Sequence, residues 1–314
     1  MAVLGGGVTA MSWQPTRDPV TGETPCPFIE TVVIPRTADI GGFEVRRAVP
    51  SMQKRSVGPF VFVDEFGPTL FGAGDGIDVP PHSHIGLATV TYLFAGEQTH
   101  RDSLGTRQVI RPGDVNWMTA GSGIAHSERT PPALRATGST LFGVQTWVAL
   151  PAPYEEVAPS FAHHGVDDLP VIEDGGKSVR LIVGSAYGAR SPVATFSETL
   201  YLDAALQAGA VLPLPAEHEE RAVYVVSGRV RIGGDDFPPQ RLLVLRPGDT
   251  VEVEALEETR LLVFGGEPLD GPRKLWWNFV ARSRERIEQA KEDWREGRFG
   301  TIPDETERLP LPER

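Results

Sequence analysis

Two pairs of residues in this chain have the types and the spacing of metal ligands. The first pair lies in Pro81-His82-Ser83-His84 and the second in His126-Ser127-Glu128. On a β-strand, residues two positions apart point to the same face. Two such strands side by side would direct three imidazoles and one carboxylate at one point. That ligand set suits a borderline divalent metal such as Fe, Mn, Ni, Cu or Zn.

The sequence around both pairs is typical of strands and turns. The first pair follows Val79-Pro80-Pro81 and precedes the β-branched run 88–93, whereas the second follows the turn-like Gly121-Ser122-Gly123. A histidine pair can also be solvated and inert. We interpret His163-His164 in that way, because it stands beside Gly165 without a strand pattern. The context of the other two pairs favours a metal site in a β domain.

A pattern of strand, glycine, further strand and turn occurs twice. The first copy begins at 91–97 (TYLFAGE) and the second at 223–229 (VYVVSGR). Each leads into an Arg-Pro-Gly-Asp tetrapeptide, at 111–114 and at 246–249. Pro followed by Gly fits a type II turn, which needs a positive φ at the glycine. The offsets are 132 residues at the strands and 135 at the turns, so the sequence predicts an internal duplication of one all-β domain.

The second copy lacks the ligands of the first. When the two offsets are applied to the four candidate ligands, every position holds an apolar residue, and His218, Glu219 and Glu220 lie nearby but out of register. We therefore expect one metal per chain and a structural second domain. The equivalent positions are Leu214, Ala216, Leu261 and Val263.

The chain divides into two β domains, a connecting segment and a terminal helix. The prolines between 151 and 170 predict a linker that crosses the surface. An apolar stripe at i, i+3 and i+7 from Ile287, within 282–298, predicts a helix docked on the β domains. The tail after Gly300 is polar and contains prolines, so we expect it to be poorly ordered beyond its first few residues. The predicted ranges are 28–150 for the N-terminal domain, 151–178 for the linker, 179–278 for the C-terminal domain and 279–300 for the helix.

Charge and composition disfavour several kinds of partner. The chain has 314 residues and a net charge of −12, which disfavours binding to nucleic acid or to anionic membranes. No apolar run approaches the ~20 residues of a membrane span, and the residues from Met1 to Gly7 do not resemble a signal peptide. Cys26 is the only cysteine, so no internal disulfide is possible and we expect a cytoplasmic location.

Other side chains near the candidate ligands have two interpretations each. His100 is interpreted as a hydrogen-bonded structural histidine, with orientation of a ligand or lining of a pocket as the alternative. Trp117 and Met118 are expected to pack the interior of the domain near the site, or else to form a pocket wall. Three phenylalanines are predicted to belong to the core rather than to a ligand platform; they are Phe60, Phe62 and Phe66.

Seven short motifs lie close together in the first copy: 82–86 (HSHIG), 89–93 (TVTYL), 96–97 (GE), 100–105 (HRDSLG), 110–115 (IRPGDV), 117–121 (WMTAG) and 123–128 (GIAHSE). Together they resemble the pirin family of the cupin superfamily, and the duplication and the terminal helix extend the resemblance to most of the chain. The resemblance implies two double-stranded β-helix barrels, with a single metal, usually iron, in the N-terminal barrel. It also implies that the metal ligands are His82, His84, His126 and Glu128. Many cupins have a further glutamate, but here that position is close to Ala88.

Such a metal could serve catalysis. An Fe(II) with four protein ligands keeps up to two octahedral positions open, and its Lewis acidity would lower the pKa of a bound enol. Glu128 could detach briefly and take the substrate proton, which would make it the catalytic residue. Some pirins resemble quercetin 2,3-dioxygenases in activity, so the first hypothesis is a dioxygenase acting on a flavonol, with dioxygen as the second substrate. Fe(II) is the expected metal, with Mn, Ni, Cu, Co and Zn as alternatives.

Two further hypotheses belong to other classes. The resemblance also implies a non-enzymatic protein that modulates a transcription factor or a metabolic enzyme through a metal-dependent contact. A purely structural metal is the third hypothesis, although structural zinc sites are usually closed and tetrahedral. Turnover of quercetin with oxygen uptake would identify the enzyme, and a bound protein partner without turnover would identify the interaction protein.

Overall fold

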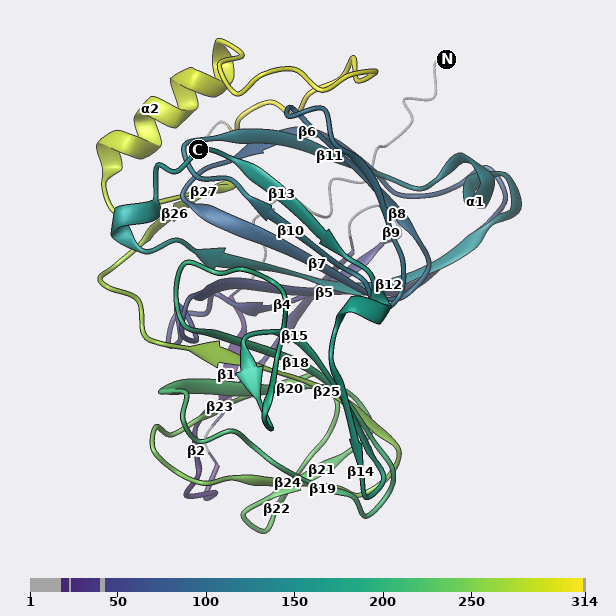
Figure 1. Cartoon of the computed structure of the whole chain (residues 1–314), viewed down its shortest axis with the longest axis vertical. Helices are drawn as coiled ribbons and strands as arrows, with labels where there is room; N and C mark the ends of the chain where they lie inside the picture. Colours follow the sequence, from purple (N-terminus) through teal and green to yellow (C-terminus); the bar gives the residue numbers. More distant parts are fainter. Residues whose placement is uncertain (1–17, 23, 40–42, 313–314) are drawn as a thin grey trace.

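The computed structural model describes residues 18–22, 24–39 and 43–312, and it consists of two β barrels stacked along the long axis with one longer helix at the side (Figure 1). The predicted all-β class with two tandem barrels and a C-terminal helix is confirmed. The segment from Met1 to Gly7, which was considered for a signal peptide, lies outside the described residues. Among the described residues, no helix has the length and apolarity to cross a membrane.

The first barrel is formed by two sheets whose inner faces enclose the candidate ligands. Its small sheet contains, in spatial order, β6 (Asp78–His84), β11 (Ile124–Arg129), β8 (Gln98–Asp102) and β9 (Arg107–Ile110). Its large sheet contains β13 (Ser160–His164), β10 (Val115–Thr119), β7 (Leu87–Ala95), β12 (Ser139–Ala149), β5 (Phe60–Phe71), β4 (Glu44–Val49) and β3 (Arg36–Asp39). The short helix α1 (Pro132–Thr137) lies between β11 and β12 in the chain.

The second barrel has the same plan. Its small sheet contains β19 (Val211–Pro213), β24 (Glu252–Ala255), β21 (Val230–Ile232) and β22 (Asp235–Phe237). Its large sheet contains β1 (Val20–Gly22), β2 (Ile29–Ile34), β23 (Arg241–Leu245), β20 (Glu220–Ser227), β25 (Thr259–Gly266), β18 (Thr199–Leu206), β15 (Lys177–Val183) and β14 (Val171–Asp174). A two-stranded ribbon of β16 (Ser185–Ala186) and β17 (Ala189–Arg190) accompanies it.

The strand order confirms the duplication. The large sheets run β10-β7-β12-β5 in one barrel and β23-β20-β25-β18 in the other, and the sequence repeats fall on β7 with β20. The two repeated turns also match their prediction, because Gly113 has φ +85° and Gly248 has φ +82°. In the first turn the amide of Asp114 donates to the carbonyl of Arg111 over 3.0 Å, as a four-residue turn requires.

The two barrels differ in what fills them. One continuous apolar cluster fills the second barrel. The interior of the first barrel instead holds two separate apolar clusters, one around Phe66 and Leu93 and one around Phe62 and Met118. A third cluster, which includes Phe60, joins the outer faces of the two large sheets. The three phenylalanines named above are therefore all core residues, as predicted, and each has at most 1% of its surface exposed.

Strands are exchanged between the barrels. Strand β2 precedes the first barrel in the chain but pairs with β23 of the second, whereas β13 precedes the second barrel but pairs with β10 of the first. The segment 151–178 holds two complete strands, β13 and β14, and the start of β15, besides the short 3₁₀ turns η1 (Ala152–Tyr154) and η2 (Val166–Asp168). A strand at the edge of a sheet depends on a distant partner, which the local pattern does not reveal.

The expectation that His163-His164 lies outside any strand is wrong, and His163 is only partly solvated. His163 lies in β13, half-buried, and its Nδ1 donates to Oδ1 of Asn116 over 2.8 Å. Its neighbour His164 is opposite Val115 of β10. Both histidines follow the strand pairing that places this segment in the first barrel.

The C-terminal segment packs against the first barrel. Helix α2 (Arg284–Arg295) buries Ile287, Ala290 and Trp294, which is the predicted stripe, and Ser283 caps its N-terminus by accepting from the amide of Arg286. The ribbon β26 (Lys274–Trp276) with β27 (Phe279–Ala281) lies beneath it. The expectation of a poorly ordered tail is wrong up to residue 312, because the amide of Leu309 donates to Pro81 and its carbonyl accepts from Trp294 Nε1.

Candidate metal centre

The two ligand pairs come together because β6 and β11 are antiparallel neighbours. His126 lies opposite His82, and Ile124 lies opposite His84. A shift of register after His126 places Glu128 opposite Val79. All four candidate side chains point into the first barrel and are buried, with 0–2% of their surface exposed. The i, i+2 spacing thus acts as strand geometry requires.

The three histidines form a compact group of nitrogen donors. One ring nitrogen from each of His82, His84 and His126 lies within 4.8 Å of the others. The Nε2 atoms of His84 and His126 are 3.0 Å apart. His82 Nδ1 is 2.9 Å from the carbonyl oxygen of Pro80, which can only accept, so Nδ1 carries the proton. The Nε2 atom of His82 therefore has a free lone pair, and it has no hydrogen-bond partner.

Glu128 lies beside this group rather than within it. Its Oε2 is 4.0 Å from His82 Nε2 and has no hydrogen-bond partner, and its Oε1 is 3.5 Å from His126 Nδ1. Gln145 on β12 donates to Oε1 over 3.2 Å. One carboxylate oxygen is thus held by the large sheet, while the other faces the histidines.

Burial keeps the imidazoles neutral. It lowers the pKa of His82 to about 4, against the opposing effect of the Pro80 carbonyl. Burial, together with the neighbouring imidazoles, also lowers the pKa of His84 and of His126 well below the ordinary value. A neutral imidazole is the form that ligates metals, so the three rings are ready to bind at neutral pH.

Glu128 is affected in the opposite direction. Burial raises the pKa of Glu128 to about 8, although the hydrogen bond from Gln145 opposes this. Ionising a carboxyl group in such a buried environment is costly, although the charge of Arg129 also opposes the rise of this pKa. The residues present fit a divalent metal, because three neutral imidazoles lie beside a carboxylate, and both Glu128 Oε2 and His82 Nε2 are buried without a hydrogen-bond partner. Three nitrogens and one carboxylate oxygen are a donor set for Fe, Mn, Ni, Cu, Co or Zn.

Of the three side chains expected near the ligands, Met118 and His100 lie where the sequence predicts and Trp117 does not. Met118 lies inside the barrel with Trp147, whose ring meets His84 edge-on at 5.1 Å between centroids. Trp117, expected to pack in the same interior, lies in the cluster shared by the two barrels. Successive residues of a strand point to opposite faces, so Trp117 and Met118 cannot both face the ligands. His100 is hydrogen-bonded, as we had interpreted it, and also adjoins His126.

Two further residues, Gln145 and Asp102, lie near the ligands and are not among the residues predicted from the sequence. Gln145 holds Glu128, and nothing in its local sequence indicates this because the contact crosses from one sheet to the other. Asp102 accepts from His100 over 3.0 Å. Asp102 could have been found, because His100-Arg101-Asp102 has the same i, i+2 spacing as the ligand pairs.

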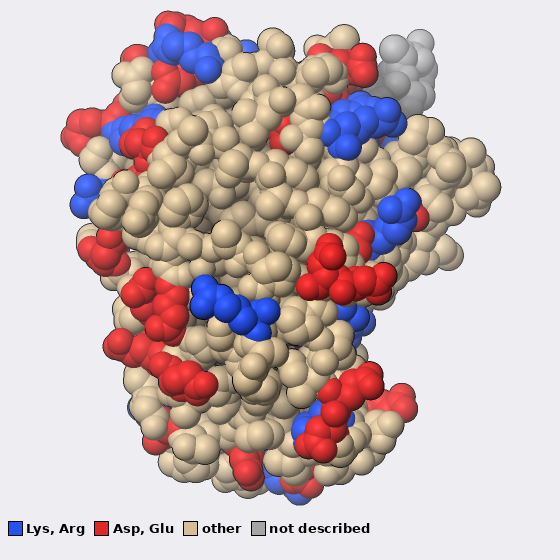
Figure 2. Space-filling model, in the orientation of Figure 1, with Lys and Arg blue, Asp and Glu red and all other residues tan. Residues whose placement is uncertain are grey.

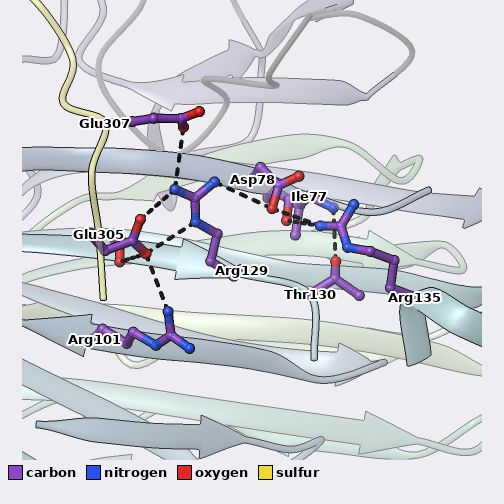
Figure 3. A network of polar contacts seen from close by, with 9 residues as sticks. Ile77, Asp78, Arg101, Arg129, Thr130, Arg135, Glu305 and Glu307 are labelled. Carbon is purple, nitrogen blue, oxygen red and sulfur yellow. Dashed lines mark hydrogen bonds and ion pairs between the residues drawn. The ribbon is translucent and has the colours of Figure 1, made fainter. Parts of the chain in front are cut away.

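The outer face of β11 is held by the C-terminal tail. Glu305 accepts from Ser127 over 2.8 Å. It also accepts from Arg129 over 2.5 and 3.1 Å and lies 3.6 Å from Arg101 on β8 (Figure 3). Ser127 and Arg129 alternate with His126 and Glu128 along the strand. Strand β11 is therefore fixed on the outside by the residues that flank its two candidate ligands.

Three of the four equivalent positions of the second barrel hold apolar side chains in its interior, whereas Ala216 is exposed. Leu214, Leu261 and Val263 all belong to the continuous cluster in its interior. His218 faces Glu198 at 2.5 Å instead.

Comparisons with known proteins agree along the chain. Residues 42–148 match the family description Pirin, and residues 201–300 match the Pirin C-terminal cupin domain. A pirin-like protein of Caulobacter vibrioides is 50% identical over 91% of this chain and 100% of its own length. Human pirin is 34% identical over 82% of this chain and 89% of its own length. The crystal structure of quercetin 2,3-dioxygenase from Acinetobacter baumannii matches with a TM-score of 0.83 and 38% identity, over 91% of this chain and 97% of that one.

Proposed function

The chain belongs to the pirin family, and on that premise we propose that it is an Fe(II)-dependent dioxygenase that cleaves a flavonol such as quercetin. One observation carries the proposal: three neutral, buried imidazoles converge beside a carboxylate that has a free oxygen. The likeness to the Acinetobacter baumannii quercetin 2,3-dioxygenase supports it, at 38% identity and a TM-score of 0.83.

Each residue of the site has a definite part in this proposal. His82, His84, His126 and Glu128 would hold one metal. When bound, Fe(II) would supply Lewis acidity that lowers the pKa of a coordinated enol, together with the redox capacity that a reaction with dioxygen needs. Glu128 would detach briefly from the metal and accept the hydroxyl proton of the substrate at Oε2, because that oxygen has no protein partner. Gln145 would keep Oε1 in place during that transfer.

Partner classes follow from charge. The proposed partners are a small aromatic substrate and dioxygen. The net charge of −12 disfavours nucleic acid as a partner. On the face in Figure 2, basic side chains stand singly among acidic ones, which also supports this choice. The single cysteine, Cys26, supports a cytoplasmic location within the proposal.

Burial of the ligands favours a second candidate function. The four side chains are at most 2% exposed, so a substrate must displace neighbouring side chains to reach a metal there. A metal enclosed in this way would suit a non-enzymatic protein that binds a transcription factor or a metabolic enzyme and changes affinity with metal occupancy.

Oxygen uptake distinguishes the two candidates. The metal-free protein is loaded with Fe(II) under anaerobic conditions, and oxygen consumption and flavonol absorbance are followed after quercetin is added. The enzyme should consume oxygen only with quercetin, and His84→Ala should abolish this. His218→Ala is the matched control, since it removes a buried histidine of the second barrel. Iron-loaded protein without quercetin-dependent uptake would contradict the dioxygenase and favour the interaction protein.

A further inference from the structure

A second row of polar side chains lies beside the ligands on the inner face of the small sheet. Strand β8 pairs with β11 so that Asp102 lies opposite His126 and His100 lies opposite Glu128. Both side chains are buried, with 0% of Asp102 and 5% of His100 exposed. Neither belongs to the group of three histidines that would bind the metal. Their contacts therefore need a separate explanation.

The contacts of Asp102 fix the protonation of His100. Oδ1 of Asp102 accepts from the amides of Leu104 and Thr106 over 2.9 and 3.0 Å. Its other oxygen, Oδ2, is 3.0 Å from His100 Nε2. A carboxylate can only accept, so Nε2 of His100 carries a proton. In a neutral His100, Nδ1 is then an acceptor.

That acceptor faces a candidate ligand. His100 Nδ1 is 3.4 Å from Nδ1 of His126, so His126 Nδ1 must be the donor between them. The remaining nitrogen of His126, Nε2, then has a free lone pair and lies 3.0 Å from Nε2 of His84.

The plane of the His100 ring is also fixed. Phe161 of β13 stacks on it, with 4.5 Å between centroids and 19° between planes. The ring is thus held by Asp102 at one nitrogen, by His126 at the other and by Phe161 on its face.

We propose that Asp102 and His100 form a hydrogen-bonded relay that sets the tautomer and the orientation of His126 as a metal ligand. They are positioning residues that act through His126. The inference rests on the metal site proposed above. Partners that orient a ligating histidine typically change metal affinity by about 10- to 100-fold when they are removed.

Two substitutions break the relay in different ways. His100→Phe keeps a ring for Phe161 but removes both nitrogens. Asp102→Asn keeps the shape, and its oxygen must stay on the amides of Leu104 and Thr106. Its NH₂ group then faces His100 Nε2, which becomes an acceptor, and the His100 proton moves to Nδ1. Two N–H groups would then face each other between His100 and His126, so the relay is broken with all rings in place.

Two controls separate this effect from general destabilisation. His100→Gln keeps one donor and one acceptor and should recover part of the lost affinity. His218→Phe makes the same change as His100→Phe at a buried histidine of the second barrel, and it should leave Co(II) affinity unchanged. Thermal unfolding of each metal-free variant records any loss of stability that is unrelated to the metal.

Co(II) binding provides the test. Its affinity is measured by competition with a chelator, and the exchangeable Nδ1 proton of His126 is followed by paramagnetic NMR of the Co(II) protein. We expect His100→Phe and Asp102→Asn to weaken binding by about 10- to 100-fold and to make that proton exchange faster. Unchanged affinity and exchange in both variants would overturn the relay, even if the metal-free proteins unfold earlier. Wild-type protein that binds no Co(II) would overturn the metal site and the relay together.

Discussion

An ionised Glu128 would favour metal binding but destabilise the metal-free fold. Burial raises its pKa to about 8, so its ionised form is costly in the metal-free protein. The same ionised oxygen is what a dication would need, and binding near neutral pH should therefore release a proton. At the proposed metal site, the carboxylate that would raise metal affinity lowers the stability of the metal-free protein.

Glu128→Gln should separate these two effects. The amide cannot ionise, so we expect it to raise the free energy of unfolding of the metal-free protein by about 1–3 kcal/mol near pH 7.5 and to weaken metal binding. The pKa of Glu128 in the folded protein lies above the ordinary value of 4.5. The metal-free wild-type protein should therefore lose stability as the pH rises from about 4.5 to 8. The gain from Gln should therefore grow over that window and level off above it.

Urea unfolding of both metal-free proteins between pH 4.5 and 8.5 measures this difference. If the Gln variant has the same stability as the wild-type protein at every pH, ionisation of Glu128 does not destabilise the fold. That result would contradict the buried environment described for Glu128.

At the scale of elements, β11 is held from both sides. Its inner face carries His126 and Glu128, and its outer face is tied to the tail through Glu305. Glu305 is largely buried, with 5% of its side chain exposed, so its ion pair with Arg129 is little screened by solvent. The tail thus contacts a strand that is far from it in sequence and that carries two candidate ligands.

Glu305→Gln should loosen the tail and β11 together. A charged hydrogen-bonded pair contributes about 1.5–3 kcal/mol, so amide exchange in the tail and in β11 should accelerate by at least about tenfold. Hydrogen exchange followed by mass spectrometry would locate the change. Glu307→Gln is the matched control, because the Glu307 side chain is 66% exposed and its contact with Arg129, at 3.4 Å, is longer than that of Glu305. Unchanged exchange in β11 would show that the tail does not support the strand.

At this scale the sequence predicts features that follow from local patterns, and it does not predict features that depend on long-range pairing. The i, i+2 spacing of His82 and His84 predicts a shared face because strand geometry is local. The repeated Arg-Pro-Gly-Asp turn revealed the duplication for the same reason. The strand at Ser160–His164 and the docking of Leu309 on Pro81 could not be predicted, since each depends on a partner far away in the chain.

Within the candidate site the same distinction holds. The three histidines that the structure brings together were all identified from their spacing. Gln145 was missed because it belongs to the opposite sheet. Trp117 is expected near the ligands together with Met118, but strand parity directs it to the cluster between the barrels.

At the scale of the whole molecule, the two barrels are built to unfold as one. They exchange β2 and β13, share one apolar cluster, and are joined by Tyr92, which donates to Asp203 of the second barrel over 2.6 Å. Arg260 also donates to Asp203, at 2.6 and 2.9 Å. Neither barrel keeps its full sheet or its buried polar partners without the other.

We therefore predict a single cooperative unfolding transition. Calorimetry of the metal-free protein should give one peak, and urea curves followed by tryptophan fluorescence and by circular dichroism should coincide. Two separated transitions would contradict this prediction, and would show that the exchanged strands do not couple the barrels.

Among the described residues, a polar layer that contains the four candidate ligands lies between the two apolar clusters inside the first barrel. The most direct test of its role is to count the iron it retains. Metal-free wild-type protein, His84→Ala and His218→Ala are loaded with Fe(II) under anaerobic conditions, freed of excess metal and analysed for iron and protein. We predict about one iron per chain in the wild type and in His218→Ala, and almost none in His84→Ala. A wild-type protein that retains no iron, or a His84→Ala variant that retains as much as the wild type, would contradict the metal site in the first barrel.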